Sequence, residues 1–285
     1  MKANPASFRD PAGRVFESDG EVYRAIYDAG MEDFRSASRD GIYDILIKKN
    51  LLIDHREVAP ETLGKSCNAI CLRHPRVPMV SYPWEWPFSA LRDAALLHLR
   101  IMEILVPRGY WLRDANAFNV QFDGERLKLI DTLSIGRREA DRPWVAYKQF
   151  CSQFLAPLAV AAKSDIRLFD LWRSNLEGFP LDLAVKLLPG SARLNPRLYM
   201  HLYLHARMQV SSDSKDQLHE TSPKEVRMSD TALLGLVRSL RKAVAGLSYK
   251  PSSAIWQGYT EIRTYDEADV KTKTRFIEQA IERLE

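Results

Sequence analysis

The sequence has few cysteines, no long apolar run and no marked excess of either charge. Its three cysteines, Cys67, Cys71 and Cys151, are an odd and sparse set, which argues against a disulfide framework and fits a reducing compartment. The longest apolar runs, such as 154–162, are far shorter than the ~20 residues that cross a bilayer. Residues 1–20 are charged where a signal peptide would be apolar. These absences predict a cytoplasmic protein with no membrane partner.

The charge balance also excludes one kind of partner. Lys+Arg 41 against Asp+Glu 37 leaves a net charge of +4, too small and too dispersed an excess to predict a nucleic-acid footprint. Hydrophobic residues make up 46% of the chain and charged residues 27%, as in globular proteins that form a core. At about 150 residues per domain, the length predicts two domains or one two-lobed domain.

The first half of the chain combines short strands with one long helix. A Ser18-Asp19-Gly20 turn joins two short extended runs within 9–26, which predicts a hairpin. Helical spacing of apolar residues follows over 31–52, with Gly41 weakening its middle. Residues 76–86 are extended and punctuated by prolines, and 89–106 is the clearest amphipathic helix.

The second half is predicted to be mostly helical after one more hairpin. Residues 110–130 contain short apolar strands around an Asp123-Gly124 turn signal. Apolar faces at helical spacing run from 144 to 210. Residues 211–225 are polar and predict a linker, and 266–285 predict an amphipathic helix.

Three oxygen-bearing side chains lie where this hairpin brings them together. Asp114 and Asn119 are five positions apart, the separation of Asp and Asn in the protein-kinase catalytic loop. Asn119 precedes the first strand of the hairpin and Asp131 follows the second, so both emerge at the same end of the ribbon. Phosphoryl transfer needs an Asp beside the attacking hydroxyl, and an Asn and an Asp as oxygen ligands of Mg²⁺. We therefore predict Asp114 as the catalytic residue, and Asn119 and Asp131 as metal ligands.

The segment around these residues resembles the protein-kinase-like superfamily. Leu112-Arg113-Asp114 matches its H-R-D motif, and Asp131-Thr132-Leu133 matches D-F-G. The resemblance implies an α+β, two-lobed fold with a small β-containing N-lobe and a mainly helical C-lobe. By this resemblance, residues 1–86 would form a reduced N-lobe and hinge, and 87–210 the C-lobe. From its composition, 211–225 would be a linker, and the amphipathic pattern predicts that 226–285 is a helical C-terminal segment that leads to an absent domain. The resemblance to the protein-kinase-like superfamily also implies Mg²⁺ and ATP as ligands.

Three further residues are candidates for contacts with the nucleotide. Arg24 lies in a strand where kinases carry a phosphate-binding Lys, and Arg and Lys are not interchangeable there. Trp84 and Trp86 lie at the predicted hinge and can stack on the adenine ring. A surface position for Arg24 and core anchoring for the two tryptophans are the alternatives. The sequence also departs from the kinase pattern, because position 112 is not His and no Gly-x-Gly-x-x-Gly loop precedes the first helix.

A second resemblance covers more of the chain. It rests on FRDPAGRV (8–15), SYPWEWPFS (81–89), RDANAFNVQF (113–122), IDTLS (130–134) and QFCSQFLAP (149–157). These segments resemble the N-terminal region of bacterial class I SAM-dependent methyltransferases related to nodulation proteins. In that family the helix matching 271–285 leads into the methyltransferase domain. No SAM-binding glycine loop follows a strand in this chain, so SAM is expected only if a further domain is present.

Two functions follow from these patterns and remain open at this point. The first is a module that binds Mg²⁺ and a nucleotide and phosphorylates a hydroxyl acceptor. The second is a non-catalytic kinase-like scaffold, a pseudokinase, that regulates a methyltransferase domain in the same or a partner chain. Asp114, Asn119 and Asp131 taken singly also suit turn or cap positions, where Asp and Asn are common for local reasons.

Overall fold

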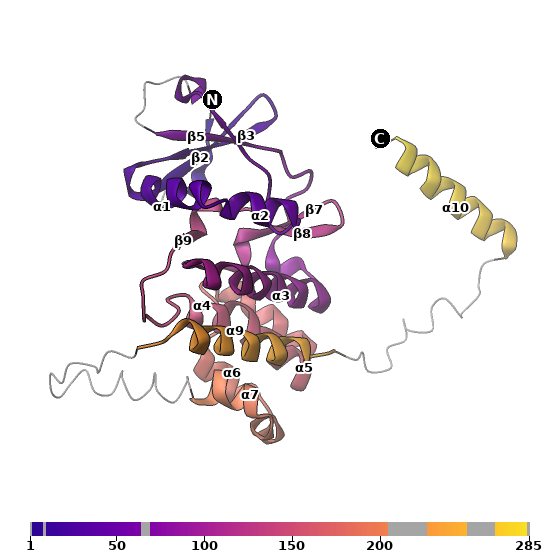
Figure 1. Ribbon diagram of the computed structural model, residues 1–285. Coiled ribbons are helices and arrows are strands. Elements are labelled where there is room, and N and C mark those ends of the chain that lie inside the picture. The colour runs from indigo at the N-terminus through magenta and orange to yellow at the C-terminus, as the bar shows by residue number, and fades with distance from the viewer. Residues whose placement is uncertain (1, 8–9, 64–68, 205–226, 250–265, 284–285) are drawn as a thin grey trace. The chain divides into compact units, whose positions relative to one another are not determined.

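The computed structural model describes residues 2–7, 10–63, 69–204, 227–249 and 266–283. These residues fall into two compact units, Met1–Tyr249 and Lys250–Glu285. In the first unit a β-sheet lies at one end, helices lie at the other, and a β-hairpin lies between them (Figure 1).

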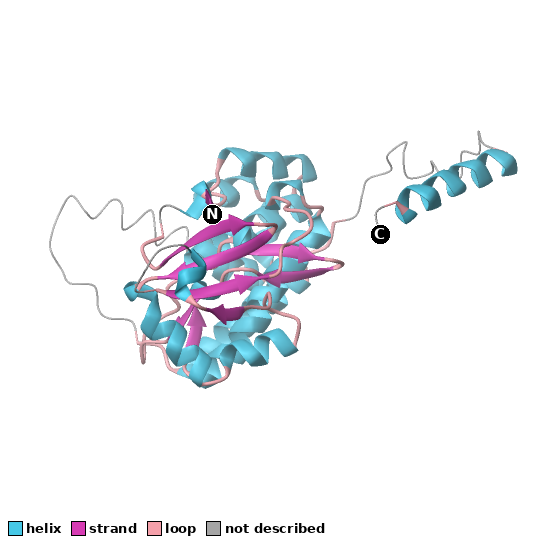
Figure 2. Cartoon of the chain, turned by 90° about the horizontal axis from the view of Figure 1, so that it is seen from above, coloured by secondary structure: helices cyan, strands magenta, loops and turns pink. Residues whose placement is uncertain are grey.

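The N-terminal part is a five-stranded antiparallel sheet with strand order β1-β2-β3-β5-β4. Its strands are β1 (Lys2–Ala3), β2 (Gly13–Ser18), β3 (Glu21–Ile26), β4 (Arg56–Val58) and β5 (Ile70–His74). Asp19 and Gly20 connect β2 to β3 with φ of 52° and 80°, the left-handed geometry of a tight hairpin turn. The predicted first hairpin is therefore confirmed. Seen from above, the strands lie over the helices of the rest of the unit (Figure 2).

One predicted helix proves to be two. Helix α1 spans Asp28–Arg39 and helix α2 spans Ile42–Lys48. Gly41 separates them with a φ of 68°, a left-handed conformation that ends the first helix. The rings of Phe34 and Tyr43 stack across this break at 5.1 Å. The two helices therefore pack on each other instead of continuing as a single rod.

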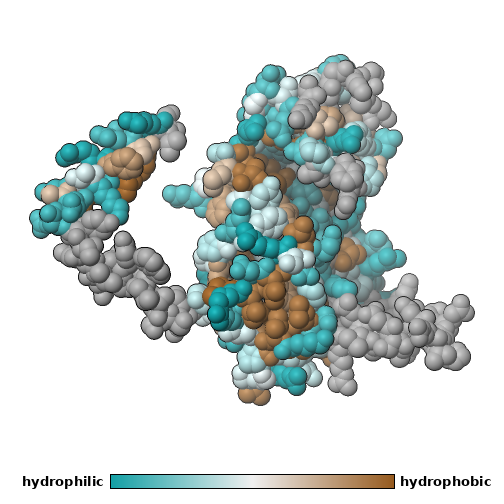
Figure 3. Space-filling model, turned by 180° about the vertical axis from the view of Figure 1, so that it is seen from behind, coloured by the Kyte–Doolittle hydropathy of each residue, from teal (hydrophilic) through white to brown (hydrophobic). Residues whose placement is uncertain are grey.

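Helix α3 (Phe88–Leu105) is the centre of the helical part, as its apolar pattern predicts. It contacts α9 (Asp230–Ala245), α5 (Ala156–Lys163) and the strands β6 (Tyr110–Leu112) and β8 (Arg126–Leu129). The remaining α-helices of this part are α4 (Tyr147–Phe150), α6 (Leu181–Leu187) and α7 (Pro196–Leu198), with π-helical turns at Cys151–Leu155 and Tyr199–Leu204. Its 3₁₀ turns are Val106–Arg108, Ile166–Ser174 and Gly190–Leu194. Figure 3 shows apolar residues gathered on one face of this part.

Two short antiparallel pairs connect the sheet to the helices. Strand β6 (Tyr110–Leu112) pairs with β9 (Ile135–Arg137), and β7 (Val120–Asp123) pairs with β8 (Arg126–Leu129). The β7–β8 turn consists of Gly124 and Glu125, one residue later than the Asp123-Gly124 signal suggests. The backbone of Leu129 bonds to Leu51 and Ile53 after α2, so the hairpin is fixed to the N-terminal part.

The predicted α+β class, with a small β-containing N-terminal part and a mainly helical second part, is confirmed. Helix α9 lies in the predicted 226–285 segment, but it packs on α3 and belongs to the first unit. The predicted 211–225 linker lies outside the described residues. Cys71 and Cys151 are buried free thiols, and Cys67 is outside the described residues.

The described part of the second unit contains helix α10 (Glu267–Glu282). Asp266 and Asp269 form a reciprocal capping box at its start. Val270, Phe276 and Ile277 are at least half exposed, so an apolar face of this helix has no partner within the described residues. No described helix has the length and apolar content needed to cross a bilayer.

Candidate functional site

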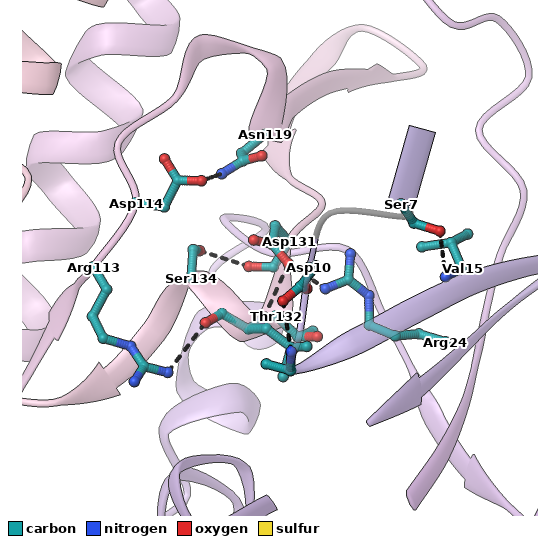
Figure 4. A network of polar contacts seen from close by, with 12 residues as sticks. Ser7, Asp10, Val15, Arg24, Arg113, Asp114, Asn119, Asp131, Thr132 and Ser134 are labelled. Atoms are coloured by element: carbon teal, nitrogen blue, oxygen red, sulfur yellow. Dashed lines mark hydrogen bonds and ion pairs between the residues drawn. The ribbon is translucent and has the colours of Figure 1, made fainter. Parts of the chain in front are cut away.

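Asp114 lies just after β6 and accepts three hydrogen bonds. Its Oδ2 accepts from Nδ2 of Asn119 at 3.0 Å, and its Oδ1 accepts from the backbone N–H of Asn116 at 3.0 Å. The third donor is Nε2 of Gln149, at 2.6 Å from Oδ1. The carboxylate is thus fixed by neutral donors from its own loop and from α4. Figure 4 shows Asp114 and Asn119 side by side.

Gln149 is a site residue that the sequence analysis does not single out. Besides donating to Asp114, it accepts the backbone N–H of Ala115 through Oε1 at 2.8 Å. The Gln149 side chain therefore bonds to both the Asp114 carboxylate and the backbone of the next residue, Ala115. It lies in the QFCSQFLAP segment of the second resemblance, but no spacing rule connects it to a residue 35 positions earlier.

The hairpin brings Asn119 and Asp131 to one end, as its pattern predicts. The backbone N–H of Ile130 donates to the carbonyl of Asn119 at 2.8 Å, which places the two segments next to each other. Asp131 also caps the 3₁₀ turn Thr132–Ser134, since its Oδ1 accepts from the Leu133 N–H at 3.2 Å. Asn119 and Asp131 thus have local structural roles in addition to their predicted roles as ligands.

Arg24 reaches Asp131 from strand β3. Its Nη1 forms an ion pair with Oδ1 of Asp131 across 107 positions of sequence. The two side chains are 14% and 18% exposed, so solvent screens this pair less than a surface ion pair. Figure 4 shows the guanidinium directed at the Asp131 carboxylate. The surface position considered for Arg24 does not occur, and this pair joins the sheet to the loop after β8.

Buried neutral rings lie beside this ion pair. Burial, the positive charge of Arg24 and the nearby His55 together lower the pKa of His74 to about 3. Burial and then the negative charge of Asp131 raise the pKa of Tyr43 above its usual range, and its hydroxyl donates to the Thr132 carbonyl at 3.3 Å. His74 therefore stays uncharged next to Arg24, and Tyr43 supports the turn that follows Asp131.

Asp33 of helix α1 also approaches the site, but it forms an ion pair with Arg113 and not with Arg24. Oδ2 of Asp33 lies 2.7 Å from Nη1 of Arg113, and its Oδ1 accepts from the Arg137 backbone N–H at 3.0 Å. Helix α1 therefore holds the segment before Asp114 and strand β9, and Asp33 does not pair with Arg24.

The two tryptophans at the predicted hinge have different environments. Trp86 is 4% exposed, and its Nε1 donates to Oγ of Ser81 at 2.8 Å, so it anchors the core and has no free ring face. Trp84 is partly exposed. It stacks on Tyr82 at 4.9 Å and meets the edge of Phe118, in the loop between Asp114 and Asn119, at 5.2 Å.

Two pockets lie near these elements without including the three predicted catalytic and metal residues. One of about 440 Å³ is lined by His55, His74 and Arg73, among others. The other, of about 630 Å³, lies between the end of α2, the start of α3 and the β7–β8 hairpin. The Asp114 and Asp131 carboxylates thus lie outside both pockets.

The donor set for a divalent cation is small. Within the described part of the chain, Oδ2 of Asp131 and Oδ1 of Asn119 accept no hydrogen bond from other residues. Two oxygens of this kind suit Mg²⁺, which is held by one or two side chains together with substrate phosphates. The described residues contain no cluster of three His, Cys, Asp or Glu able to hold a metal on its own. Oδ2 of Asp131 and Oδ1 of Asn119 are therefore the oxygens of this site that could hold a metal.

Comparison with known proteins gives one relative in sequence and likenesses in structure. No family model matches the chain. The chain is 34% identical over 278 residues to the nodulation protein NoeA of Rhizobium meliloti (strain 1021), a match that covers 96% of this chain and 58% of NoeA. The solved kinase domain of Mycobacterium tuberculosis PknI superposes with a TM-score of 0.44 at 12% identity, over 86% of this chain and 95% of that domain. The chain is thus similar to a nodulation protein and spans a little over half of that relative's length.

Proposed function

We propose that residues 1–249 form a kinase-like module that binds a nucleotide with Mg²⁺ and transfers a phosphoryl group to a hydroxyl. The observation that supports this most is the convergence of Asp114, Asn119 and Asp131 next to Arg24 of the sheet. A base-like carboxylate, two oxygen ligands and a strand-borne cation are the groups that phosphoryl transfer requires.

Each side chain has a separate role in this proposal. Asp114 accepts or orients the proton of the attacking hydroxyl, and Gln149 and Asn119 keep its carboxylate in place. Asn119 and Asp131 hold Mg²⁺, which when bound neutralises charge on the phosphates. Arg24 binds phosphate oxygens through guanidinium N–H groups, of which it has five. Trp84 supplies an aromatic surface for the base.

Thermal unfolding with and without ATP and Mg²⁺ tests nucleotide binding. A ligand at 100 times its Kd stabilises the folded state by about 2.7 kcal/mol. We expect a Mg²⁺-dependent rise of the melting temperature in the wild type that is lost in Asp131→Asn. Asp123→Asn is the matched control, because Asp123 pairs with Lys128 in the β7–β8 hairpin, outside the site. The absence of any shift in the wild type contradicts nucleotide binding.

A magnesium-dependent phosphotransfer assay tests catalysis separately. Asp114→Ala removes the base-like carboxylate, and general-base groups contribute about 10²- to 10⁴-fold to rates. We expect turnover to fall by that factor in Asp114→Ala and to remain in Asp123→Asn. Turnover unaffected by Asp114→Ala would exclude the catalytic role.

A non-catalytic module is the second candidate, and the Arg24–Asp131 ion pair favours it because the pair uses an oxygen of a predicted metal ligand. In this case the fold is a regulatory scaffold for a methyltransferase domain, in the same or a partner chain. This association comes from the sequence resemblance alone, and SAM is expected only if a further domain is present, where it would bind that domain and not residues 1–249. A melting temperature raised by SAM in this chain would contradict that assignment.

A further inference from the structure

The Asp131 carboxylate is already paired with a positively charged side chain, the guanidinium of Arg24. Its Oδ1 is shared by Nη1 of Arg24 and the N–H of Leu133, and Oδ2 is its remaining oxygen. Arg24 has no other ion pair in the described residues, and the acidic Asp33 of α1 is committed to Arg113 and Arg137. Asp131 is therefore the only ion-pair partner of Arg24 in the described part of the chain.

Asp10 is a second carboxylate close to this pair in Figure 4, and its Oδ1 accepts the backbone N–H of Ala12 at 2.8 Å. His74, in strand β5 next to β3, is 6% exposed and carries an imidazole whose Nδ1 bonds to the Asp54 carbonyl. The Asp54 carbonyl is an acceptor, so Nδ1 carries a hydrogen, and Nε2 is buried without a hydrogen-bond partner, which favours the neutral ring. A guanidinium released from Asp131 is stabilised by another anion, and phosphate oxygens match the donor geometry of a guanidinium as carboxylates do.

We propose that the Arg24–Asp131 ion pair excludes divalent cations from Asp131 until nucleotide phosphates take over the Arg24 guanidinium. This inference rests on the proposed nucleotide binding and adds its regulation. In the free protein a divalent cation at Asp131 would share one carboxylate with a guanidinium of like charge, which is unfavourable. When phosphates bind Arg24, the Asp131 carboxylate is released to a metal ion, and each charge keeps a partner.

The consequence is coupled binding of metal and nucleotide. By thermodynamic linkage, a nucleotide that raises metal affinity must gain affinity from the metal by the same factor, and such couplings are typically about 5- to 150-fold. A preformed metal site would instead bind the ion in the absence of nucleotide. Metal binding measured without nucleotide therefore distinguishes coupled binding from a preformed metal site.

Titration of Mn²⁺ without nucleotide, followed by electron paramagnetic resonance, tests the exclusion directly. We expect weak binding to the wild type and at least about tenfold tighter binding to Arg24→Gln, within the usual range of such couplings. The double variant Arg24→Gln/Asp131→Asn should return to weak binding, because the freed carboxylate is gone. Arg73→Gln is the matched control, since it breaks the exposed Arg73–Glu21 pair of the same sheet, and its Mn²⁺ affinity should equal that of the wild type.

Two results overturn the proposal. One is tight Mn²⁺ binding to the wild type. The other is an Mn²⁺ affinity of Arg24→Gln that equals that of the wild type. If circular dichroism shows that Arg24→Gln does not fold, Arg24→Met takes its place in this comparison. ATP binding is measured on the same proteins. If none binds ATP, the proposed function fails, while the nucleotide-free Mn²⁺ titration still decides whether Arg24 keeps metal off Asp131.

Discussion

The two halves of the candidate site are built in different ways. Around Asp114, neutral amide and backbone donors fix one carboxylate, and the most distant of them is 35 positions away. Around Asp131, the main contact is an ion pair with Arg24 that spans 107 positions and joins the β-sheet to the loop after β8. The first half is positioned within the helical part, and the second depends on how the two parts of the unit pack.

The contacts of Asp114 position its carboxylate, whereas the contact of Asp131 with Arg24 also compensates its charge. The amide donors leave the negative charge of Asp114 in place, as a base-like residue requires. The guanidinium of Arg24 compensates the charge of Asp131, which under our proposal disfavours the entry of another cation. In the proposed function, the site thus combines an available base with a metal ligand that Arg24 occupies.

The largest expected effect comes from removing the Asp131 charge. Asp131→Ala leaves the partly buried Arg24 without a countercharge, and breaking a buried pair in this way costs about 3 kcal/mol. Denaturant unfolding should show this loss, whereas Asp123→Ala, which breaks the hairpin pair with Lys128, should cost about 0.5 kcal/mol. The double variant Arg24→Met/Asp131→Leu should recover most of the loss. A cost for Asp131→Ala no larger than that of the control would mean that the pair does not join the two parts.

A pair of glutamines tests the amide-built half. Gln149 bonds to the Asp114 carboxylate and to the Ala115 N–H, while Gln121 bonds to both backbone groups of Ser81. Hydrogen bonds to charged groups are stronger, so we expect Gln149→Leu to cost about 2 kcal/mol and Gln121→Leu about 1 kcal/mol in chemical denaturation. The reverse order would show that the Asp114 contact adds nothing beyond a neutral bond.

Acid should affect the ion-paired half through His74. Its pKa falls from 6.5 to about 3 on folding because of burial and the Arg24 charge, so below pH 6.5 the unfolded chain binds a proton that the folded chain does not. Stability is therefore lost as pH falls from 6.5 toward 3, with a slope of at most about 1.4 kcal/mol per pH unit. Unfolding at several pH values should show a shallower slope in His74→Phe, and an unchanged slope would be evidence against this assignment.

The smallest effect is expected at the contact between α1 and the loops. Asp33 and Arg113 are 23% and 39% exposed, so Asp33→Asn should cost about 0.5 kcal/mol, as for exposed ion pairs. Double-variant analysis with Arg113→Gln measures the coupling between the two side chains. A coupling energy between Asp33 and Arg113 as large as that between Arg24 and Asp131 would contradict the expectation that the more exposed pair contributes less.

Local patterns predict the elements that depend on neighbours in sequence. The Ser18-Asp19-Gly20 turn and the apolar face of α3 have strong local signals, and both elements form as predicted. The helix predicted over 31–52 divides in two because Gly41 takes a left-handed conformation. Trp86 shows the limit of such patterns, since an aromatic residue at a hinge can face a ligand or the core and only packing selects between them.

The sequence by itself determined that Asn119 and Asp131 emerge at the same end of one hairpin, because strand pairing across a short turn is a local property. Only the tertiary structure decided which distant groups contact the loops that carry Asp114 and Asp131. Arg24, Asp33 and Gln149 come from a strand and two helices far apart in the chain, and long-range partners of this kind leave no periodic or spacing signal. The cation bound to Asp131 and the donors around Asp114 are therefore consequences of how the sheet, α1 and α4 pack around the loops.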